Sequence, residues 1–279
     1  MVTGAASGIG RRAAVQIAAA GDHAVVIART HDRARDLVAE ASAAARDGGK
    51  VTVVPADLAD LAQVRRAAER IVELGPIDAL INNAATFDLA RKTPRLTVDG
   101  IEQTFAVNHV APFVLTAGVR PALRDDAMVV TAGSKRLLWL PLLRMDRDDI
   151  DSRNHYSPIR GYFRSKIAQL AFTAELARRG VAASALRIPS VRVDDDKLIG
   201  YRAHQRAPYR LKAPFAADPA VIAAGYLTLA ASAPTMRARY VDERGRDVRW
   251  THGTGVPAFG AWVWDQTAAL AGRTPPTER

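Results

Sequence analysis

The chain of 279 residues is long enough to bury a large core and has the size of a single α/β domain. It contains no cysteine, which excludes disulfides, cysteine nucleophiles and thiolate metal sites, and its six histidines show no spacing typical of metal ligands. No apolar run approaches the ~20 residues of a membrane span, and the N-terminus does not resemble a signal peptide. We therefore expect one soluble, cytoplasmic domain without a metal site.

The net charge of +10 raises the question of nucleic-acid binding, because clustered lysines and arginines neutralise phosphates. The arginines are instead scattered from Arg11 to Arg279 and usually stand beside acids, as in residues 33–36 and 242–244. No basic run alternates with aromatic residues. This distribution favours a solvated basic surface, part of which serves a phosphorylated cofactor, over a nucleic-acid partner.

A glycine-rich turn opens the chain. The first three residues predict the end of a strand, residues 4–10 the turn, and the apolar spacing up to Gly21 a helix. Such a turn lets the backbone approach a pyrophosphate, whose charge is met by the free N–H groups and the dipole of the helix. The strand is short, since a buried strand usually has about 5–6 residues.

A second apolar run, residues 24–28, predicts the neighbouring parallel strand. No acid follows it to hydrogen-bond a ribose 2′-hydroxyl; Arg29 stands there instead, with Arg33 shortly after. A cation at this place suits a 2′-phosphate, so the sequence favours NADP(H) over NAD(H). The alternative is that Arg29 points to solvent.

Three more strands are predicted, at residues 51–54, 77–81 and 128–134, with helices between them. Repeated strand–helix–strand units predict an α/β fold with a doubly wound parallel sheet and helices on both faces, in one domain over residues 1–279.

Polar residues follow these strands at the sheet edge where ligands of α/β proteins bind. Asp57 is placed either to contact an adenine or to cap the helix that starts near Leu61. Asn82 and Asn83 either hydrogen-bond the backbone of a turn or line a crevice. Ser134 is either a ligand contact or an ordinary turn serine.

Tyr162 and Lys166 lie one turn apart on the same face of a predicted helix. An ammonium favours a phenolate, so we expect Lys166 to lower the pKa of Tyr162 from its usual value of roughly 10. Such a tyrosine donates a proton to a carbonyl oxygen. Tyrosine and lysine at this spacing also occur on many solvated helices. Asn108 lies inside another predicted helix, where asparagine is unfavourable.

Taken together and in this order, the motifs resemble the short-chain dehydrogenase/reductase family over nearly the whole chain. The motifs are the turn at residues 3–10, Asp57, the Asn-Asn-Ala run at 82–84, Asn108, Ser134 and the segment at 162–166. The resemblance implies a Rossmann fold and an oxidoreductase that moves hydride between a nicotinamide and a carbonyl or alcohol.

The resemblance also assigns roles. It implies that Tyr162 is the general acid/base and that Lys166 binds the nicotinamide ribose. Ser134 would hydrogen-bond the reacting oxygen, and Asn108 would hold a water of the proton relay. The residues expected to contact NADP(H) are Gly4, Ser7, Gly8, Ile9, Gly10, Arg29, Asp57, Leu58, Asn83, Ala84, Tyr162, Lys166, Pro189 and Val191.

Within the family, the later half resembles the retinol dehydrogenase and protochlorophyllide reductase branch. The resemblance lies in the long interval between Ser134 and Tyr162, residues 156–179, residues 240–246 and the terminal helix around 261–265. Bacterial members of the branch include ketoreductases of antibiotic biosynthesis that act on polyketides such as the anthracyclines. Family members often form homodimers through the helices of Asn108 and Tyr162, although this branch also contains monomers.

Two positions depart from the family pattern. Ala85 replaces the glycine that usually ends the Asn-Asn-Ala motif, which removes backbone freedom. Residues 188–191, with Ser190, stand in place of a Pro-Gly turn beside the nicotinamide amide, and the threonine that often follows is absent.

On the substrate side, the apolar residues 137–143 either wall a pocket for a bulky lipophilic or aromatic substrate or form core. Residues 190–215 fall where family members place a substrate lid. We expect an NADP(H)-dependent reductase of a small-molecule ketone or aldehyde, with a retinol- or steroid-type alcohol dehydrogenase as the alternative. A rival of another class is a non-catalytic NADP(H)-sensing protein, but such proteins usually lose the tyrosine or the lysine.

Overall fold

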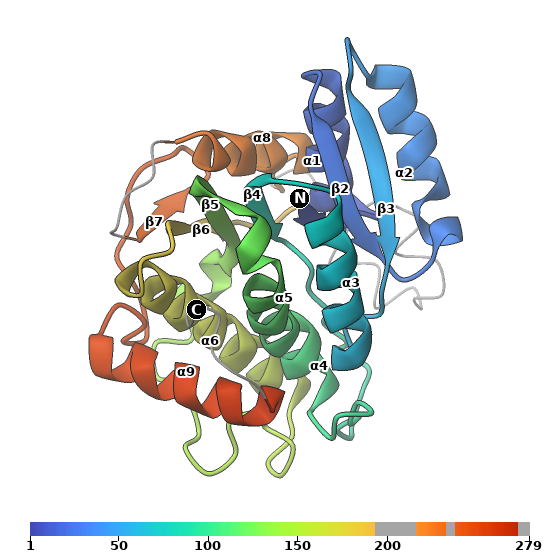
Figure 1. The fold of residues 1–279 in the computed structure, drawn as a ribbon. Helices are drawn as coiled ribbons and strands as arrows, with labels where there is room; N and C mark the ends of the chain where they lie inside the picture. The colour runs from blue at the N-terminus through green and yellow to red at the C-terminus, as the bar shows by residue number, and fades with distance from the viewer. Residues whose placement is uncertain (193–215, 233–237, 273–279) are drawn as a thin grey trace.

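The structure is a computed structural model that describes residues 1–192, 216–232 and 238–272. Within these residues a seven-stranded parallel sheet forms the centre, in the order β3-β2-β1-β4-β5-β6-β7 (Figure 1). The predicted parallel sheet is confirmed. The strands are β1 (Val2–Thr3), β2 (His23–Ala28), β3 (Lys50–Pro55), β4 (Ile77–Asn82), β5 (Leu123–Ser134), β6 (Ala183–Ile188) and β7 (Arg239–Asp242).

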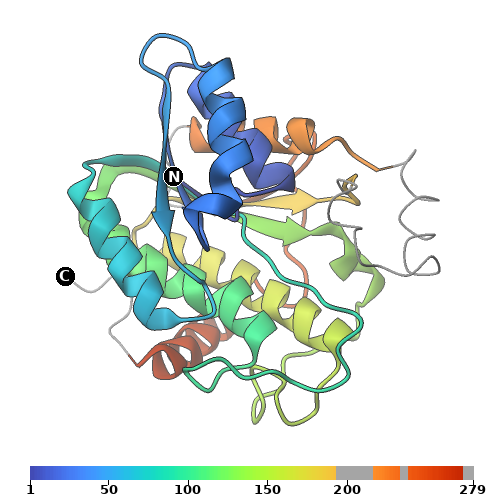
Figure 2. The same cartoon turned by 90° about the vertical axis from the view of Figure 1, so that its right-hand side faces the viewer.

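Helices cover both faces of the sheet, as Figure 2 shows: α1, α2 and α8 on one side, α3, α5 and α6 on the other, with α9 outside α6. The fold is therefore doubly wound, as predicted. None of these helices is long and apolar enough to cross a membrane in the part of the chain that the structure describes. The helices are α1 (Gly8–Ala19), α2 (His31–Ala44), α3 (Leu61–Glu73), α4 (Gln103–Phe105), α5 (Ala111–Val119), α6 (Pro158–Arg178), α8 (Pro219–Ala230) and α9 (Pro257–Ala271).

The core between the sheet and α5, α6 and α9 is aromatic. The Trp264 ring on α9 lies 5.1 Å from the Phe113 ring on α5 and 5.7 Å from the Phe172 ring on α6, measured between centroids. Such contacts bury large apolar areas and bind the C-terminal helix to the layer that carries the predicted tyrosine.

The helix predicted to contain Asn108 is not regular. The short α4 passes into a π-helical turn, η1 (Ala106–Val110), before α5 begins. A π-turn inserts one extra residue into the helix, which changes the direction of the side chains, and such turns are common at functional sites. This is the structural reason that an asparagine is tolerated there.

The first strand is short, as expected. Val2 pairs with Val26 of β2 and with Ile81 of β4, while the preceding parts of both neighbouring strands have no β1 partner. A cavity of about 430 Å³ lies there. The Met1 ammonium is buried beside it and donates a hydrogen bond to the Ala79 carbonyl at 2.8 Å.

Candidate active site

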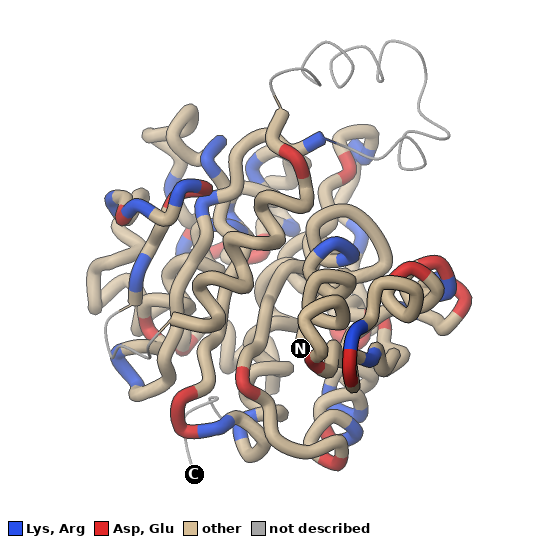
Figure 3. Tube along the Cα trace, turned by 90° about the horizontal axis from the view of Figure 1, so that it is seen from above, with Lys and Arg blue, Asp and Glu red and all other residues tan. Residues whose placement is uncertain are grey.

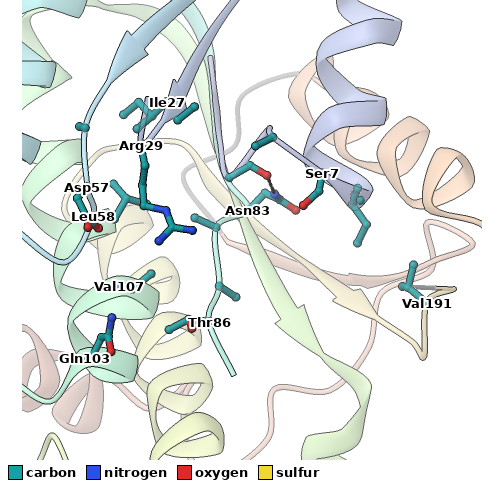
Figure 4. A pocket seen from close by; sticks show the side chains of 18 of the residues that line it. Ser7, Ile27, Arg29, Asp57, Leu58, Asn83, Thr86, Gln103, Val107 and Val191 are labelled. Atoms are coloured by element: carbon teal, nitrogen blue, oxygen red, sulfur yellow. Dashed lines mark hydrogen bonds between the residues drawn. The ribbon is translucent and has the colours of Figure 1, made fainter. Parts of the chain in front are cut away.

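A cavity of about 500 Å³ runs along the carboxyl edge of the first four strands (Figure 4). It is built from the turn after β1 and the segments that follow β2, β3 and β4, so it lies where the direction of the chain connections reverses and α/β sheets bind ligands. The predicted cofactor contacts that line it are Gly4, Ser7, Gly8, Ile9, Arg29, Asp57, Leu58, Asn83, Ala84 and Val191.

The glycines of the first turn are required by close packing. Gly4 has a φ of +66°, and a Cβ there would lie 2.7 Å from the Cα of Ala84. Gly10 does not line the cavity but packs behind the residues that do. A Cβ on Gly10 would lie 2.5 Å from both the Asn83 side-chain nitrogen and the Gly4 carbonyl oxygen. Gly10 therefore supports the turn rather than contacting a ligand directly.

Asn83 fastens this turn to β4. Its Nδ2 donates to the carbonyls of Thr3 and Gly4, at 2.9 and 3.3 Å, and its Oδ1 accepts from the Tyr226 hydroxyl of α8 at 3.3 Å. The Thr3 hydroxyl in turn accepts from the backbone N–H groups of Asn83 and Ala84. Three elements thus hold the glycine turn in one position.

The N-terminus of α1 opens onto the cavity. Its N-cap, Ser7, makes no side-chain capping bond, and the first turn contains no acid. Ser7, Gly8 and Ile9 all line the cavity, so the positive end of the helix dipole points at the space. Together with the absence of room for side chains at Gly4 and Gly10, this arrangement fits the pyrophosphate of a dinucleotide.

Arg29 and Arg33 have different positions. Arg29 lies in the cavity wall with Asp57 and Leu58, and Figure 4 shows its side chain extending into the cavity. Arg33 is exposed on α2 and does not line the cavity. A guanidinium at the position of Arg29 fits the 2′-phosphate of NADP(H).

Asp57 does not cap the following helix, so that alternative is wrong. Asp60 is the N-cap of α3 and accepts from the backbone N–H groups of Ala62 and Gln63. Asp57 accepts from the Ala59 N–H at 2.9 Å and remains in the cavity wall. A short turn separates the strand end from the helix, which is why the later aspartate reaches the helix N-terminus.

Tyr162 and Lys166 lie together in α6, as the spacing predicted. The Tyr162 ring stacks against Phe87 at a centroid distance of 4.4 Å, and the Lys166 Nζ is 5.9 Å from the Tyr162 ring centroid. That ammonium donates to the Ala132 carbonyl of β5 at 3.1 Å and to Gln169 Oε1 at 2.7 Å. Lys166 therefore ties α6 to the strand that ends at Ser134.

The expected lowering of the tyrosine pKa by Lys166 is wrong for this arrangement. Burial raises the pKa of Tyr162 to about 12, against a smaller lowering by the charge of Arg136. Burial also lowers the pKa of Lys166 to about 7. Both groups lose the stabilisation of water, and the lysine is directed at the carbonyl and amide oxygens rather than at the phenol.

Ser134 ends β5 and is buried. Its backbone hydrogen-bonds the Tyr240 hydroxyl of β7, and a Cβ on the neighbouring Gly133 would lie 2.9 Å from the Tyr240 ring. The strand end that presents the serine is therefore held by a buried aromatic side chain, which distinguishes it from an ordinary surface turn.

Asn108 connects two parts of the site. Its Oδ1 accepts from the Thr86 N–H at 2.7 Å, and its Nδ2 donates to the Thr86 carbonyl and to the Ser165 hydroxyl. The Ser165 hydroxyl donates to the Tyr162 carbonyl at 2.6 Å. Asn108 thus joins the loop after β4 to the helix turn that carries the tyrosine; its predicted water contact stays a prediction.

Several residues of the site were not found from the sequence. Thr86, Gln103, Val107 and Arg192 line the cavity, and Phe87 stacks on Tyr162. No motif marks these positions, although Thr86 and Phe87 directly follow the Asn-Asn-Ala run. Pro189, Tyr162 and Lys166, which were predicted to contact the cofactor, are not part of the cavity wall.

The two departures from the family pattern are accommodated. Ala85 lies in the cavity wall without a positive φ. Ser190 accepts a hydrogen bond from the Ala217 N–H at 2.8 Å, and Val191 pairs with Ala217, so the turn after β6 is held by backbone contacts.

The apolar segment after Ser134 divides between core and surface. Leu137 is buried with Phe163 and Ile167, whereas Trp139 and Leu142 are exposed. The exposed part borders a groove of about 850 Å³ that contains neither Ser134 nor Tyr162. Residues 193–215, which include most of the predicted lid, lie outside the described residues.

One group of potential metal ligands forms in space, although no motif predicts it: Asp146, Asp149 and His155. The Asp149 carboxylate accepts from the backbone N–H groups of Asn154 and His155. The carboxylate therefore has a structural role in holding this turn.

The fold and the cavity define a dinucleotide-binding α/β protein, and comparisons with known proteins agree. The sequence profile described as short chain dehydrogenase matches residues 1–136. A proposed daunorubicin C-13 ketoreductase, DnrU of Streptomyces sp. strain C5, is 36% identical over 181 residues, covering 64% of this chain and 60% of that protein. Retinol dehydrogenase 14 of Mus musculus is 34% identical over 191 residues, covering 64% and 55%.

Solved structures agree with the sequence comparisons. An uncharacterised protein of Mycobacterium paratuberculosis has a TM-score of 0.71 and 25% identity, with 99% of this chain and 93% of that chain covered. A blue fluorescent protein from a metagenomic library, solved in complex with NADPH, has a TM-score of 0.62 and 29% identity, covering 87% and 96%.

The match to the short-chain dehydrogenase/reductase family covers residues 1–136, and the fold of the described residues resembles the solved structures named above. The chain's matches span about half to three fifths of the length of the curated relatives named above, at 60% and 55%.

Proposed function

We propose that this chain is an NADP(H)-dependent carbonyl reductase that acts on CH–OH/C=O groups. The observation that carries the proposal is one edge of the sheet that combines a dinucleotide-sized cavity, with Arg29 in its wall, and the partly buried Tyr162 beside the buried Lys166, which is bound to β5 near Ser134. NADPH would be held by the glycine turn, the N-terminus of α1 and Arg29, and when bound it supplies the hydride.

The protein's own groups manage the proton. With its pKa raised to about 12 by burial, Tyr162 keeps its proton at neutral pH and is therefore ready to donate it to a carbonyl oxygen. The Ser134 hydroxyl donates a second hydrogen bond to the same oxygen, which stabilises the charge that develops there. Lys166, with a pKa of about 7, is able to hold or release a proton near neutrality beside the tyrosine.

Carbonyl reduction uses a protonated tyrosine and alcohol oxidation uses a phenolate, and burial raises the pKa of Tyr162 to about 12. We propose the reductive direction because cellular NADPH is a reductant. The alternative, a retinol- or steroid-type alcohol dehydrogenase, uses the same residues in reverse.

We propose a bulky lipophilic or aromatic ketone or aldehyde as substrate, with an antibiotic polyketide of the anthracycline type as one candidate. The support is the names of the relatives, which include a proposed daunorubicin ketoreductase, a retinol dehydrogenase and a polyprenol dehydrogenase. A homodimer and a cytoplasmic location remain predictions of the sequence, and light scattering tests the first.

The test is NADPH oxidation, followed by absorbance, against aromatic ketones, polyketide quinones, retinal and steroid ketones. We expect turnover with at least one of them, a loss of about 10²–10⁴-fold in Tyr162→Phe, and much poorer use of NADH. The control is Tyr156→Phe, which removes a phenol of the same helix entry that the proposal does not use.

If no panel member reacts, NADPH binding measured by fluorescence quenching separates the remaining explanations. Tight binding without turnover of any carbonyl would support the NADP(H)-sensing protein. Absence of binding would contradict the proposed function.

A further inference from the structure

The groove formed by residues 139–147 and the start of α6 is a surface of mixed character outside the cofactor site. Three of its side chains are large, apolar and exposed: Leu142 at 85%, Trp139 at 71% and Ile159 at 46%. Leu138, next to Trp139, is also exposed, at 45%. Exposed apolar side chains are ordinary when scattered, but a contiguous group marks an interaction surface.

The same groove is strongly basic. Its lining contains four arginines, Arg144, Arg147, Arg160 and Arg164, and one acid, Asp146. Only Arg164 pairs with that acid, at 3.8 Å. The other guanidinium groups have no carboxylate partner within the described residues, so the groove carries an excess of positive charge around its apolar residues.

The guanidinium groups are held by contacts that leave their charge unneutralised. Arg144 Nη1 donates to the carbonyls of Pro141 and Leu143, at 2.8 and 3.2 Å. Arg147 stacks over the Trp262 ring, 5.4 Å from its centroid. The loop therefore exposes guanidinium groups beside exposed apolar side chains.

The exposed apolar side chains, which we call the apolar tips, belong to a segment that is packed against the core. Leu137 is buried, and Leu140 and Leu143 pack against the core, so every third residue of the segment faces inwards while Leu138, Trp139 and Leu142 face outwards. A short 3₁₀ turn, η3 (Lys135–Trp139), followed by Pro141 fixes this pattern.

We propose that this surface docks reversibly on an anionic lipid bilayer, with Trp139, Leu142, Leu138 and Ile159 inserted at the interface and the arginines against the headgroups. Tryptophan prefers the interfacial layer, and arginines beside it gain from anionic headgroups. A nucleic acid would use the charges but leave the apolar tips in water. A second copy docked through the same groove would cover the tips but would add four more arginines and only one acid, Asp146, which is already paired. The proposal does not depend on the proposed enzymatic function.

The test is co-sedimentation of the full chain with vesicles of phosphatidylcholine alone or with about 30 mol% phosphatidylserine. We expect binding to the anionic vesicles only, and a decrease as ionic strength is raised from about 0.05 to 0.5 M, because salt screens the headgroup charge. Leu142→Ser should lower the partition coefficient about tenfold, and Arg160→Gln about fivefold.

Matched control variants show whether vesicle binding depends on this groove or on any exposed apolar or basic side chain. Val98 is 83% exposed, as much as Leu142, but lies outside the groove, so Val98→Ser should bind as the unchanged protein does. Arg35 is an exposed arginine of α2, and Arg35→Gln should leave binding within about twofold. Thermal melts confirm that each variant is folded.

Two results would overturn the proposal. One is absence of sedimentation with anionic vesicles, or sedimentation that Leu142→Ser leaves unchanged. The other is a concentration-dependent dimer, seen by light scattering and lost in Leu142→Ser, without vesicle binding, which would assign the surface to a second copy.

Discussion

Burial decides the chemistry of single residues in this protein. The tyrosine and lysine of α6 lie where the one-turn spacing puts them, but desolvation moves their pKa values in the directions that oppose charge: up for Tyr162 and down for Lys166. Tyr162 therefore keeps its proton at physiological pH, and the charge of Arg136 lowers its pKa by less than burial raises it.

The buried lysine makes the free energy of unfolding depend on pH. The folded-state pKa of Lys166 is about 7, below its unfolded value of 10.5, so between these values the unfolded chain binds the extra proton. Stability should therefore rise with pH across this window, by up to about 1.4 kcal/mol per pH unit, and be lost as the pH falls towards 7. Urea unfolding at several pH values between these limits measures the slope.

Two lysine variants show whether this group is responsible. Lys166→Met should remove the slope above about pH 8, where the Met1 ammonium no longer contributes, while leaving a folded protein. Lys135→Met, which removes a lysine that is half exposed and lies near Glu243, should keep it. A slope that persists unchanged in Lys166→Met would mean that Lys166 is not the titrating group.

Arg29 and Arg33 permit a sharp test of cofactor preference at the residue scale. Arg29 lines the cavity and Arg33 does not. Arg29→Ala should weaken NADPH binding about 10–100-fold and leave NADH binding nearly unchanged, because only NADPH carries the 2′-phosphate. Fluorescence titration measures both constants. Arg33→Ala serves as the matched control, and an equal loss in that variant would contradict the assignment.

At the scale of elements, connections determine how the site is held. The π-turn η1 places the Asn108 side chain within hydrogen-bonding distance of Thr86 and Ser165. The next residue, His109, is hydrogen-bonded to α9, where its Nε2 lies 2.7 Å from the Thr267 hydroxyl. Burial lowers the pKa of His109 to about 3, so the ring stays neutral. The C-terminal helix thus supports the turn that supports the tyrosine.

β1 has two residues and is the shortest strand of the sheet in the described residues. Its neighbours extend beyond it, a cavity of about 430 Å³ remains, and burial lowers the pKa of the Met1 ammonium to about 6. An added N-terminal segment of three apolar β-branched residues should fill this space and move the ammonium into water. We expect the free energy of unfolding to increase by about 2 kcal/mol, measured by urea denaturation.

A Gly-Ser segment of the same length is the control, because it moves the charge without filling the cavity. The stability gain of the apolar segment should exceed that of the control. Equal gains would show that the buried charge, rather than the cavity, limits the stability of β1.

For the whole molecule, the distribution of charge is more informative than its sum. Figure 3 shows acidic residues interspersed among the lysines and arginines along much of the Cα trace. Many arginines form ion pairs, such as Arg11 with Glu40 and Arg239 with Asp247. The net charge of +10 is therefore spread over the surface, and the groove before α6 is where unpaired arginines gather beside exposed apolar residues.

This distribution predicts weak binding to random duplex DNA. We expect no complex in a gel-shift assay at physiological salt, because few phosphates would be neutralised at once and screening at that ionic strength is strong. A stable complex whose affinity falls steeply with salt would contradict this prediction. The same DNA used as a competitor in the vesicle experiment would then show whether both ligands use the groove.

Much of the fold was predictable because its signals are local. Apolar runs of strand length, glycines in the first turn and the Tyr162–Lys166 spacing each depend on residues that are close in sequence. They correctly indicated the parallel sheet and the helix of the tyrosine, and ten of the residues predicted to contact the cofactor line the cavity. The strands β6 and β7 and the helix α8 were not predicted as elements, since no motif marked them.

The sequence by itself determined the residue types and spacings of the site: a glycine turn, a cation after β2 and a tyrosine–lysine pair on one helix face. Only the tertiary structure decided their environment. It placed Arg29 in the cavity and Arg33 outside, assigned the α3 cap to Asp60, and buried Tyr162 and Lys166 so that desolvation controls their pKa values. Burial and side-chain direction arise from contacts between distant segments, such as Asn108 with Ser165 and Lys166 with Ala132, which no local pattern contains.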